Sequence, residues 1–234
     1  MPGTIDVAIP DWIELAAVLV SALSGAILAA KGHEFDVGGV AALALVAGLG
    51  GGLIRDVLLG QGAPAALRDE RYLIVVVAAT GLGFFFAGIL NQFQGLLLVL
   101  DAAALGLYSV VGADKADQVG LPAISAVLLG AITGVGGGIL RDLLSGTTPV
   151  IFKRDIYALL ATFGSAFYLA LRQTDLHATA AALIAIGMIF VARLVVVRFH
   201  LDGPRPRDLA VSLPERWPRV TGPRRQRRRL RRRV

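Results

Sequence analysis

Residues 48–60 read GLGGGLIRDVLLG, and residues 134–146 read GVGGGILRDLLSG, the same pattern 86 positions later. Eight positions are identical in the two copies, and in the first copy they are Gly48, Gly50, Gly51, Gly52, Arg55, Asp56, Leu58 and Gly60. Each copy lies inside or at the end of a long apolar run. Three adjacent glycines loosen a helix, and the Arg-Asp pair one turn later places charge at membrane depth. The duplicated pattern therefore indicates a pathway for something polar.

The composition is that of an integral membrane protein. Hydrophobic residues make up 56% of the 234 residues, charged residues make up 17%, and the mean hydropathy is +0.70. Soluble domains are about 25% charged. Seven apolar stretches approach the roughly 20 residues that a helix needs to cross a bilayer. They are residues 11–30, 38–60, 72–90, 95–113, 122–146, 156–171 and 178–197. We therefore expect an all-α membrane protein with seven transmembrane helices.

The duplication extends beyond the pattern itself. Glu14 and Asp101, near the starts of the first and fourth stretches, match at an offset of 87. The repeated unit is thus about three helices, residues 11–91 in the first copy and residues 95–172 in the second. An odd number of spans puts the two units in opposite orientations, an inverted repeat of the kind that places sites between the halves. Residues 11–197 then form the transmembrane domain, and its seventh helix, residues 178–197, stands outside the duplication.

Positive charge is concentrated in the C-terminal tail. Of the 23 Lys and Arg residues, 13 lie from Arg198 onward, together with three of the 17 acidic residues. Because basic segments next to a span stay in the cytoplasm, we expect a cytoplasmic tail over residues 198–234 and an N-terminus outside. Few apolar residues follow Pro204, which predicts disorder, and the arginines are expected to lie at anionic lipid headgroups. Nucleic-acid binding competes as an interpretation, but nothing points to a specific nucleic acid.

The glycine triplets allow two interpretations. Each glycine costs about 1 kcal/mol of helix propensity relative to Ala, so the runs predict a kink or an unwound turn that lines a cavity. Close packing of two helices is the alternative, because small residues let helix backbones approach. The candidate kink residues are Gly50, Gly51, Gly52, Gly136, Gly137 and Gly138.

The repeated charges need partners or water. A charged residue in mid-bilayer costs about 2.5 to 3.5 kcal/mol on insertion scales. We hypothesise a crossed pairing between the halves, in which Arg55 faces Asp142 and Arg141 faces Asp56. The alternative is that these side chains lie at span ends and reach the headgroups. Glu14 and Asp101 are expected to form a cation-attracting mouth or to position helices, and a solvated span end explains them equally well.

The sequence offers no catalytic or metal-binding constellation. There is no cysteine, and the three histidines are far apart with no ligand spacing. The glycine triplets are not phosphate loops, since no Lys-Ser or Lys-Thr follows them. We expect a protein that is not an enzyme and that has no cofactor or metal.

The paired Gly-Gly-Gly-x-x-Arg-Asp, on the second helix of each three-helix unit, resembles that of the trimeric intracellular cation (TRIC) channel family in its bacterial branch. The resemblance covers residues from about 13 to 197. It implies a homotrimer of seven-helix subunits, each with a pore lined by kinked second and fifth helices, that conducts K⁺ and also Na⁺. It assigns the kink to the two glycine triplets and the pore charges to Arg55, Asp56, Arg141 and Asp142.

Two functions of different classes follow. The first is a cation channel of the inner membrane, in which the aspartates offset the field of the arginines. The second is a carrier for glycine or a similar small zwitterion, because the same bacterial domain has also been described as an amino-acid transporter. In such a carrier Arg would bind the carboxylate and Asp the ammonium group. A non-transporting scaffold does not explain charge at depth in both repeats.

Overall fold

The computed structural model of the chain describes residues 8–31, 35–90, 95–153, 156–199 and 201, and its regular structure there is α-helical. The long helices are α1 (Asp11–Lys31), α2 (Val37–Leu59), α4 (Glu70–Leu90), α5 (Leu96–Gln118), α6 (Ala123–Leu144), α8 (Ile156–Arg172) and α9 (Ala178–Arg198). Two helices of four residues, α3 (Ala65–Arg68) and α7 (Val150–Lys153), follow α2 and α6. The seven predicted stretches therefore match the seven long helices of the described residues. The predicted disordered tail lies outside the described residues from position 202 onward.

Five of these helices are long and apolar enough to cross a membrane. Within the described part of the chain they are α1, α2, α5, α6 and α9, with 21 to 23 residues each. Helix α8 is a shorter apolar helix of 17 residues. The all-α prediction is confirmed for the described residues, and the membrane placement of α4 and α8 stays a prediction.

Helix α5 is longer than the predicted stretch at residues 95–113. It continues to Gln118, so Asp114 and Lys115 belong to a helix and not to a polar connection. Both side chains have partners that explain the extension. The hydroxyl of Tyr168 on α8 donates to Asp114 Oδ1 at 2.5 Å, and Lys115 Nζ lies 2.7 Å from a carboxylate oxygen of Glu14. The prediction from hydropathy ended this helix too early because it treats charged residues such as Asp114 and Lys115 as solvent-exposed.

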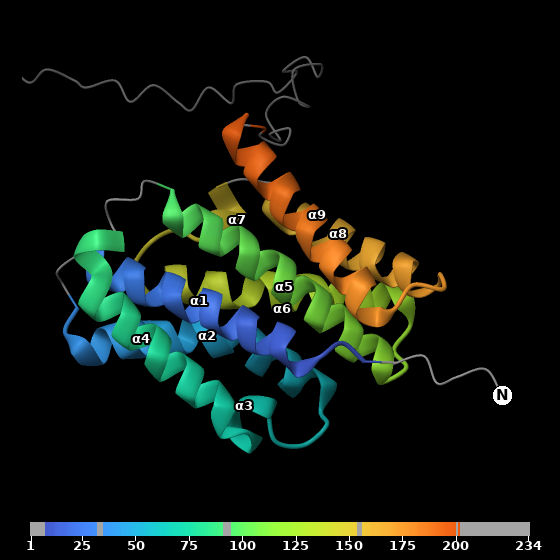
Figure 1. Cartoon of the computed structure of the whole chain (residues 1–234), viewed down its shortest axis with the longest axis horizontal. Helices are drawn as coiled ribbons and strands as arrows, with labels where there is room; N and C mark the ends of the chain where they lie inside the picture. The colour runs from blue at the N-terminus through green and yellow to red at the C-terminus, as the bar shows by residue number, and fades with distance from the viewer. Residues whose placement is uncertain (1–7, 32–34, 91–94, 154–155, 200, 202–234) are drawn as a thin grey trace, which may run out of the picture. The chain divides into compact units, whose positions relative to one another are not determined.

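The helices pack as two similar groups of three. Helices α1, α2 and α4 contact one another, and so do α5, α6 and α8. The groups meet where α1 lies along α5 and where α2 crosses α6, and α9 packs on α5 and α8. Figure 1 shows α4 and α9 on opposite sides of the α1–α5 pair. The helix that has no counterpart in the first group therefore covers only the second.

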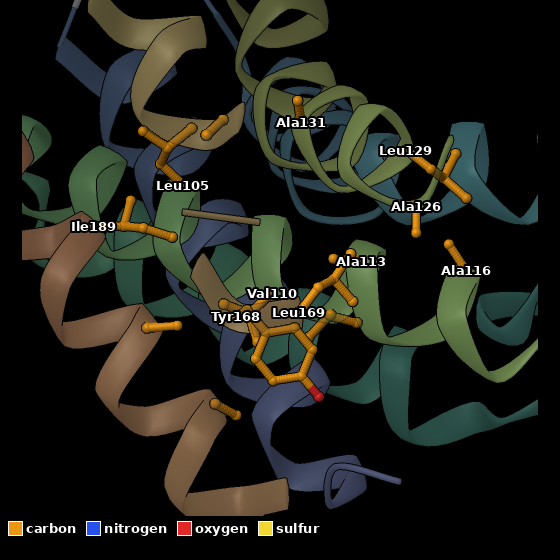
Figure 2. Close-up of a cluster of buried hydrophobic side chains, with 14 of the residues drawn as sticks. Leu105, Val110, Ala113, Ala116, Ala126, Leu129, Ala131, Tyr168, Leu169 and Ile189 are labelled. Atoms are coloured by element: carbon orange, nitrogen blue, oxygen red, sulfur yellow. The ribbon is translucent and has the colours of Figure 1, made fainter. Parts of the chain in front are cut away.

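Each group has its own hydrophobic core. One core is built from α1, α2 and α4 and includes Tyr108 of α5. The other is built from α5, α6, α8 and α9 and includes Ile13 of α1. Small residues dominate the helix contacts, as in Figure 2, where Ala116 of α5 and Ala126 of α6 point toward one another. Such contacts bring helix backbones close together, which is how helices pack where lipid replaces water.

Candidate functional site

Two clusters of buried charge lie at opposite ends of the α1–α5 pair. Cluster one consists of Glu14, Arg55, Asp56 and Lys115, and cluster two of Asp101, Arg141, Asp142 and Arg193. Glu14 opens α1 and meets Lys115 near the end of α5, so α1 and α5 are antiparallel. Asp101 and Lys115 are 14 residues apart on α5, which separates the clusters by about 21 Å along the helix axis.

In cluster one, Arg55 of α2 binds two carboxylates. Its Nη2 lies 2.7 Å from Glu14 Oε1 and 2.6 Å from Asp56 Oδ1, and its Nε donates to the same Asp56 oxygen at 2.8 Å. Lys115 Nζ reaches the other Glu14 oxygen at 2.7 Å. The Arg55 side chain is fully buried. Two cations and two carboxylates therefore balance one another, with Arg55 fully buried and the Lys115 side chain 29% exposed.

Cluster two repeats this arrangement. Arg141 Nε donates to Asp142 Oδ1 at 2.9 Å, and its Nη2 lies 3.3 Å from Asp101 Oδ1. The second cation is Arg193 of α9, whose Nη2 lies 3.9 Å from Asp101 Oδ2 and whose guanidinium lies 4.5 Å from the centroid of the Tyr157 ring. The Tyr157 hydroxyl donates to Asp101 Oδ1 at 3.3 Å. This cluster too holds two cations and two carboxylates.

The repeated aspartates connect the arginines to the short helices. Asp56 Oδ2 accepts from the backbone N–H of Ala65, the first residue of α3, at 2.8 Å. Asp142 Oδ2 accepts from the N–H of Val150, the first residue of α7, at 3.1 Å. A carboxylate at a helix N-terminus satisfies a backbone donor that has no partner within the helix. Each aspartate thereby fixes the chain that follows its own span, a role that the sequence did not reveal.

The crossed pairing predicted from sequence is wrong. Arg55 pairs with Asp56 and Arg141 with Asp142, the adjacent residues on the same helices. Backbone positions 100° apart do not prevent this, because the long Arg side chain carries five donors and folds back toward its neighbour. Asp142 lies in the cluster at the other end of the bundle, out of reach of Arg55. Contacts between the halves do exist. They include Lys115 to Glu14, Arg141 Nη1 to Ser24 Oγ at 3.0 Å, and the Tyr108 hydroxyl to the Gly48 carbonyl.

Burial describes the surroundings of these charges. Arg55 is fully buried and Arg141 is 7% exposed, so both side chains lie inside the protein. Glu14 and Asp101 are buried and ion-paired, which excludes a solvated span end. All four of the predicted pore charges and both predicted acids thus meet in the two clusters.

The glycine triplets bring α2 and α6 into close contact. Both helices are continuous through the triplets, so the predicted unwound turn is not present. A Cβ added to Gly51 would lie 2.4 Å from the carbonyl oxygen of Thr133, and one added to Gly137 would lie 2.6 Å from that of Ala47. The two backbones touch where the triplets cross, and only glycine fits. Here the alternative of close packing applies, because the helix contact offsets the low propensity of glycine.

The last glycine of each triplet borders a charge cluster. The nearest atom to a Cβ added at Gly52 is Arg55 Nη2, at 3.8 Å, and at Gly138 the neighbours are Tyr157 Oη at 3.4 Å and Asp101 Oδ1 at 3.8 Å. The glycines of one triplet therefore have two different roles within one helix turn. Its middle residue packs the helices, and its last leaves space beside the charges.

Cavities of different size adjoin the clusters. A cavity of about 510 Å³ is bordered by all four residues of cluster two, together with Leu28, Leu97, Leu98, Thr147, Thr148, Val150 and Val197. Beside cluster one, the space lined by Glu14, Arg55 and Asp56 measures only about 10 Å³. A further cavity of about 170 Å³ reaches Asp56 and Lys115 from the connection after α2. These cavities thus lie beside the charges.

Sequence reasoning missed the second cation of each cluster. Lys115 was placed in a connection between spans, and Arg193 lies in the helix outside the duplication. A charged residue in the middle of an otherwise apolar helix was the available signal for Arg193. Ser24 and Tyr157 carried no comparable signal, because lone hydroxyls are common in such helices. No group of three or more side chains suited to a metal ion is present among the described residues.

Comparison with known proteins identifies relatives over most of the chain. The model of one family, described as glycine transporter, matches residues 11–88 and 98–173. A UPF0126 membrane protein of Deinococcus radiodurans is 40% identical over 192 residues, which is 80% of this chain and 89% of the relative. The UPF0126 inner membrane protein YadS of Escherichia coli is 32% identical over 82% of this chain and 94% of its own.

Solved structures of the same fold are cation channels. One, described as showing the structural basis for conductance through TRIC cation channels, has a TM-score of 0.74 and 33% identity over 83% of this chain and 96% of its own. A TRIC trimeric intracellular cation channel orthologue from Rhodobacter sphaeroides has a TM-score of 0.73 and 33% identity over 81% and 97%. A prokaryotic TRIC channel has a TM-score of 0.75 and 27% identity over 82% and 98%. The predicted resemblance is confirmed, and these neighbours are channels and not enzymes.

Proposed function

This chain belongs to the membrane-protein family that the glycine-transporter model describes, and because its solved neighbours are TRIC cation channels, we propose that it is a channel for monovalent cations. The observation that carries the proposal is the pair of charge clusters. Buried charge lies at both ends of one helix crossing, and each cluster borders a cavity. A scaffold or a packing contact has no need for two such clusters.

The proposed path runs through each subunit between its two halves. A cation would pass from the cavity near Asp56 and Lys115, along cluster one and the glycine crossing, to cluster two and the large cavity. Carboxylates would replace part of the hydration shell, and the arginines would weaken the binding so that the ion leaves again. K⁺ is the proposed main ion, with Na⁺ also permeant, and no cofactor takes part.

We propose that the path is closed in this arrangement. Gly51 and Gly137 bring the α2 and α6 backbones too close for an added methyl group, and the space beside cluster one is about 10 Å³. Opening would therefore require α2 and α6 to separate or slide at the crossing. Leu140 packs against Gly50 and Ile54 against Gly136 at this crossing, so opening would also move these two side chains.

We place the protein in the inner membrane as a homotrimer of seven-span subunits. Antiparallel α1 and α5 support an inverted repeat, with α1, α2 and α4 opposite in direction to α5, α6 and α8. The N-terminus then lies outside, and the arginine-rich tail lies in the cytoplasm against anionic lipids. The name of the Rhodobacter sphaeroides neighbour, a trimeric channel, supports the trimer.

A carrier for glycine or another small neutral amino acid is the second candidate. It is favoured by the description of the matching family and by the presence of both Arg and Asp in each cluster. In this case Arg141 would bind a carboxylate and Asp142 an ammonium group. However, both side chains are already paired with protein groups, so a substrate would have to displace strong contacts.

Flux measurements in proteoliposomes distinguish the channel from the carrier. We expect purified protein to pass K⁺ without any substrate and to show no saturable uptake of labelled glycine. Asp142→Asn removes a negative charge at the large cavity and should lower K⁺ flux by about tenfold, the lower range of electrostatic focusing. Asp175→Asn is the matched control, because Asp175 is exposed in the turn between α8 and α9. Saturable glycine uptake without K⁺ conductance would instead establish the carrier.

A further inference from the structure

Helix α9 contributes a charge that the duplication does not provide. Arg193 is 1% exposed and lies next to Asp101, with its guanidinium on the Tyr157 ring. It also borders the large cavity at cluster two. Since α9 has no counterpart in the first group of helices, cluster one cannot obtain its second cation in the same way. Cluster one uses Lys115 of α5.

The offset of the repeat identifies the residue that could have taken this role in cluster two. Glu14 corresponds to Asp101 at an offset of 87, and the same offset pairs Lys115 with Leu28 of α1. Leu28 borders the large cavity together with Asp101. Ser24, one helical turn before Leu28, accepts from Arg141 Nη1, so this face of α1 points at cluster two. A cation at position 28 would therefore stand where Lys115 stands in cluster one.

We infer that Arg193 determines the charge of the large cavity, and so its selectivity for cations, in place of the lysine that position 28 lacks. The inference rests on the proposed channel function. Arg193 lies beside Asp101 and offsets its negative charge. Without Arg193 the cavity keeps the two carboxylates of cluster two but only one cation, and it attracts cations more strongly. Helix α9 thereby sets the selectivity of a path built by the repeats.

The experiment uses full-length protein in planar bilayers, with K⁺ conductance and the reversal potential in a KCl gradient as readouts. Arg193→Met should raise the conductance at 10 mM KCl by up to about tenfold and shift the reversal potential toward that of K⁺. The change should shrink at 1 M KCl, where the screening length falls from about 30 Å to about 3 Å. Arg198→Met is the matched control, since Arg198 is exposed at the end of the same helix.

The double variant Leu28→Lys with Arg193→Met separates charge from shape. It should return both the conductance and the reversal potential toward the wild-type values, because it copies the solution found in cluster one. If Arg193→Met alone does not fold, recovery of folding and conductance in the double variant supports the inference equally. Failure of both variants to fold overturns it, because Arg193 would then be needed for its shape.

Other outcomes distinguish this inference from the proposed function. A conducting wild type with Arg193→Met indistinguishable from Arg198→Met overturns the role of Arg193 and leaves the channel intact. Unchanged selectivity in the double variant relative to Arg193→Met also overturns it. A wild type that passes no K⁺ overturns the channel, and the selectivity role with it.

Discussion

Clusters one and two hold the same repeated residues in different surroundings. In both, an arginine pairs with the next residue and with an acid from the first helix of its group, and the aspartate holds a short helix. Cluster one encloses a space of about 10 Å³ beside Arg55 and borders a cavity of about 170 Å³ at Asp56 and Lys115, whereas cluster two borders about 510 Å³. The residues that differ lie outside the repeated pattern. Duplication therefore explains the ion pairs that the clusters share. Residues outside the repeated pattern explain why the adjoining cavities differ in size.

The largest expected effect compares the two arginines. Arg55→Met leaves Glu14 and Asp56 buried with one cation, and breaking a buried pair in this way costs about 3–5 kcal/mol of unfolding free energy. Arg141→Met should cost less, because water in the large cavity can hydrate Asp101 and Asp142. We expect this order in chemical unfolding measured in detergent micelles.

A surface pair provides the reference for this comparison. Arg71 is 55% exposed at its side chain and pairs with Asp69, so Arg71→Met should cost less than about 1 kcal/mol. Equal losses for Arg55→Met and Arg141→Met would contradict the view that the two clusters differ in access to water.

Much of this architecture was predictable because it depends on features that the sequence states locally. Apolar runs of the length of a bilayer gave the long helices, and identical residues at a constant offset gave the two groups. Six of the eight cluster charges were found because charge is expensive inside apolar helices. They are Arg55, Asp56, Arg141, Asp142, Glu14 and Asp101. The features that were predicted well are therefore those that a single segment of the chain determines by itself.

The partners of these charges could not be predicted in the same way. The choice between Asp56 and Asp142 for Arg55 depends on how far apart the two halves lie, which no local pattern states. The contact between the glycine triplets could not be predicted for a related reason. Propensity favours a break at Gly51, but contact with α6 holds the helix intact, and that contact is between segments distant in sequence.

A second prediction tests whether the helix crossing is as symmetric as the repeat. An alanine Cβ at Gly51 or Gly137 would lie 2.4 Å or 2.6 Å from a carbonyl oxygen of the other helix. Backbone cannot yield as a side chain can, so Gly51→Ala and Gly137→Ala should each lower the unfolding free energy by about 1–3 kcal/mol. Gly81→Ala is the control, because an added Cβ meets no atom within 4 Å there. A large loss in only one of the two triplets would show that one helix relaxes and the other does not.

The last prediction concerns a hydrogen bond that cluster two makes and cluster one does not. Arg141 Nη1 donates to Ser24 Oγ, whereas Arg55 Nη1 is buried without a hydrogen-bond partner among the residues the structure describes. At the offset of 87, the residue that corresponds to Ser24 is Val111, whose side chain cannot accept a hydrogen bond. Val111→Thr supplies an acceptor at nearly the same volume. Both Val110 and Val111 belong to the same apolar core, so Val110→Thr is the control that places the same hydroxyl at a position the repeat does not match to Ser24. Since one hydrogen bond contributes about 1 kcal/mol, the Val111→Thr variant should be more stable than the Val110→Thr variant by about that amount in unfolding measurements. Equal stability of the two variants would mean that Val111 does not occupy the place in cluster one that Ser24 occupies in cluster two.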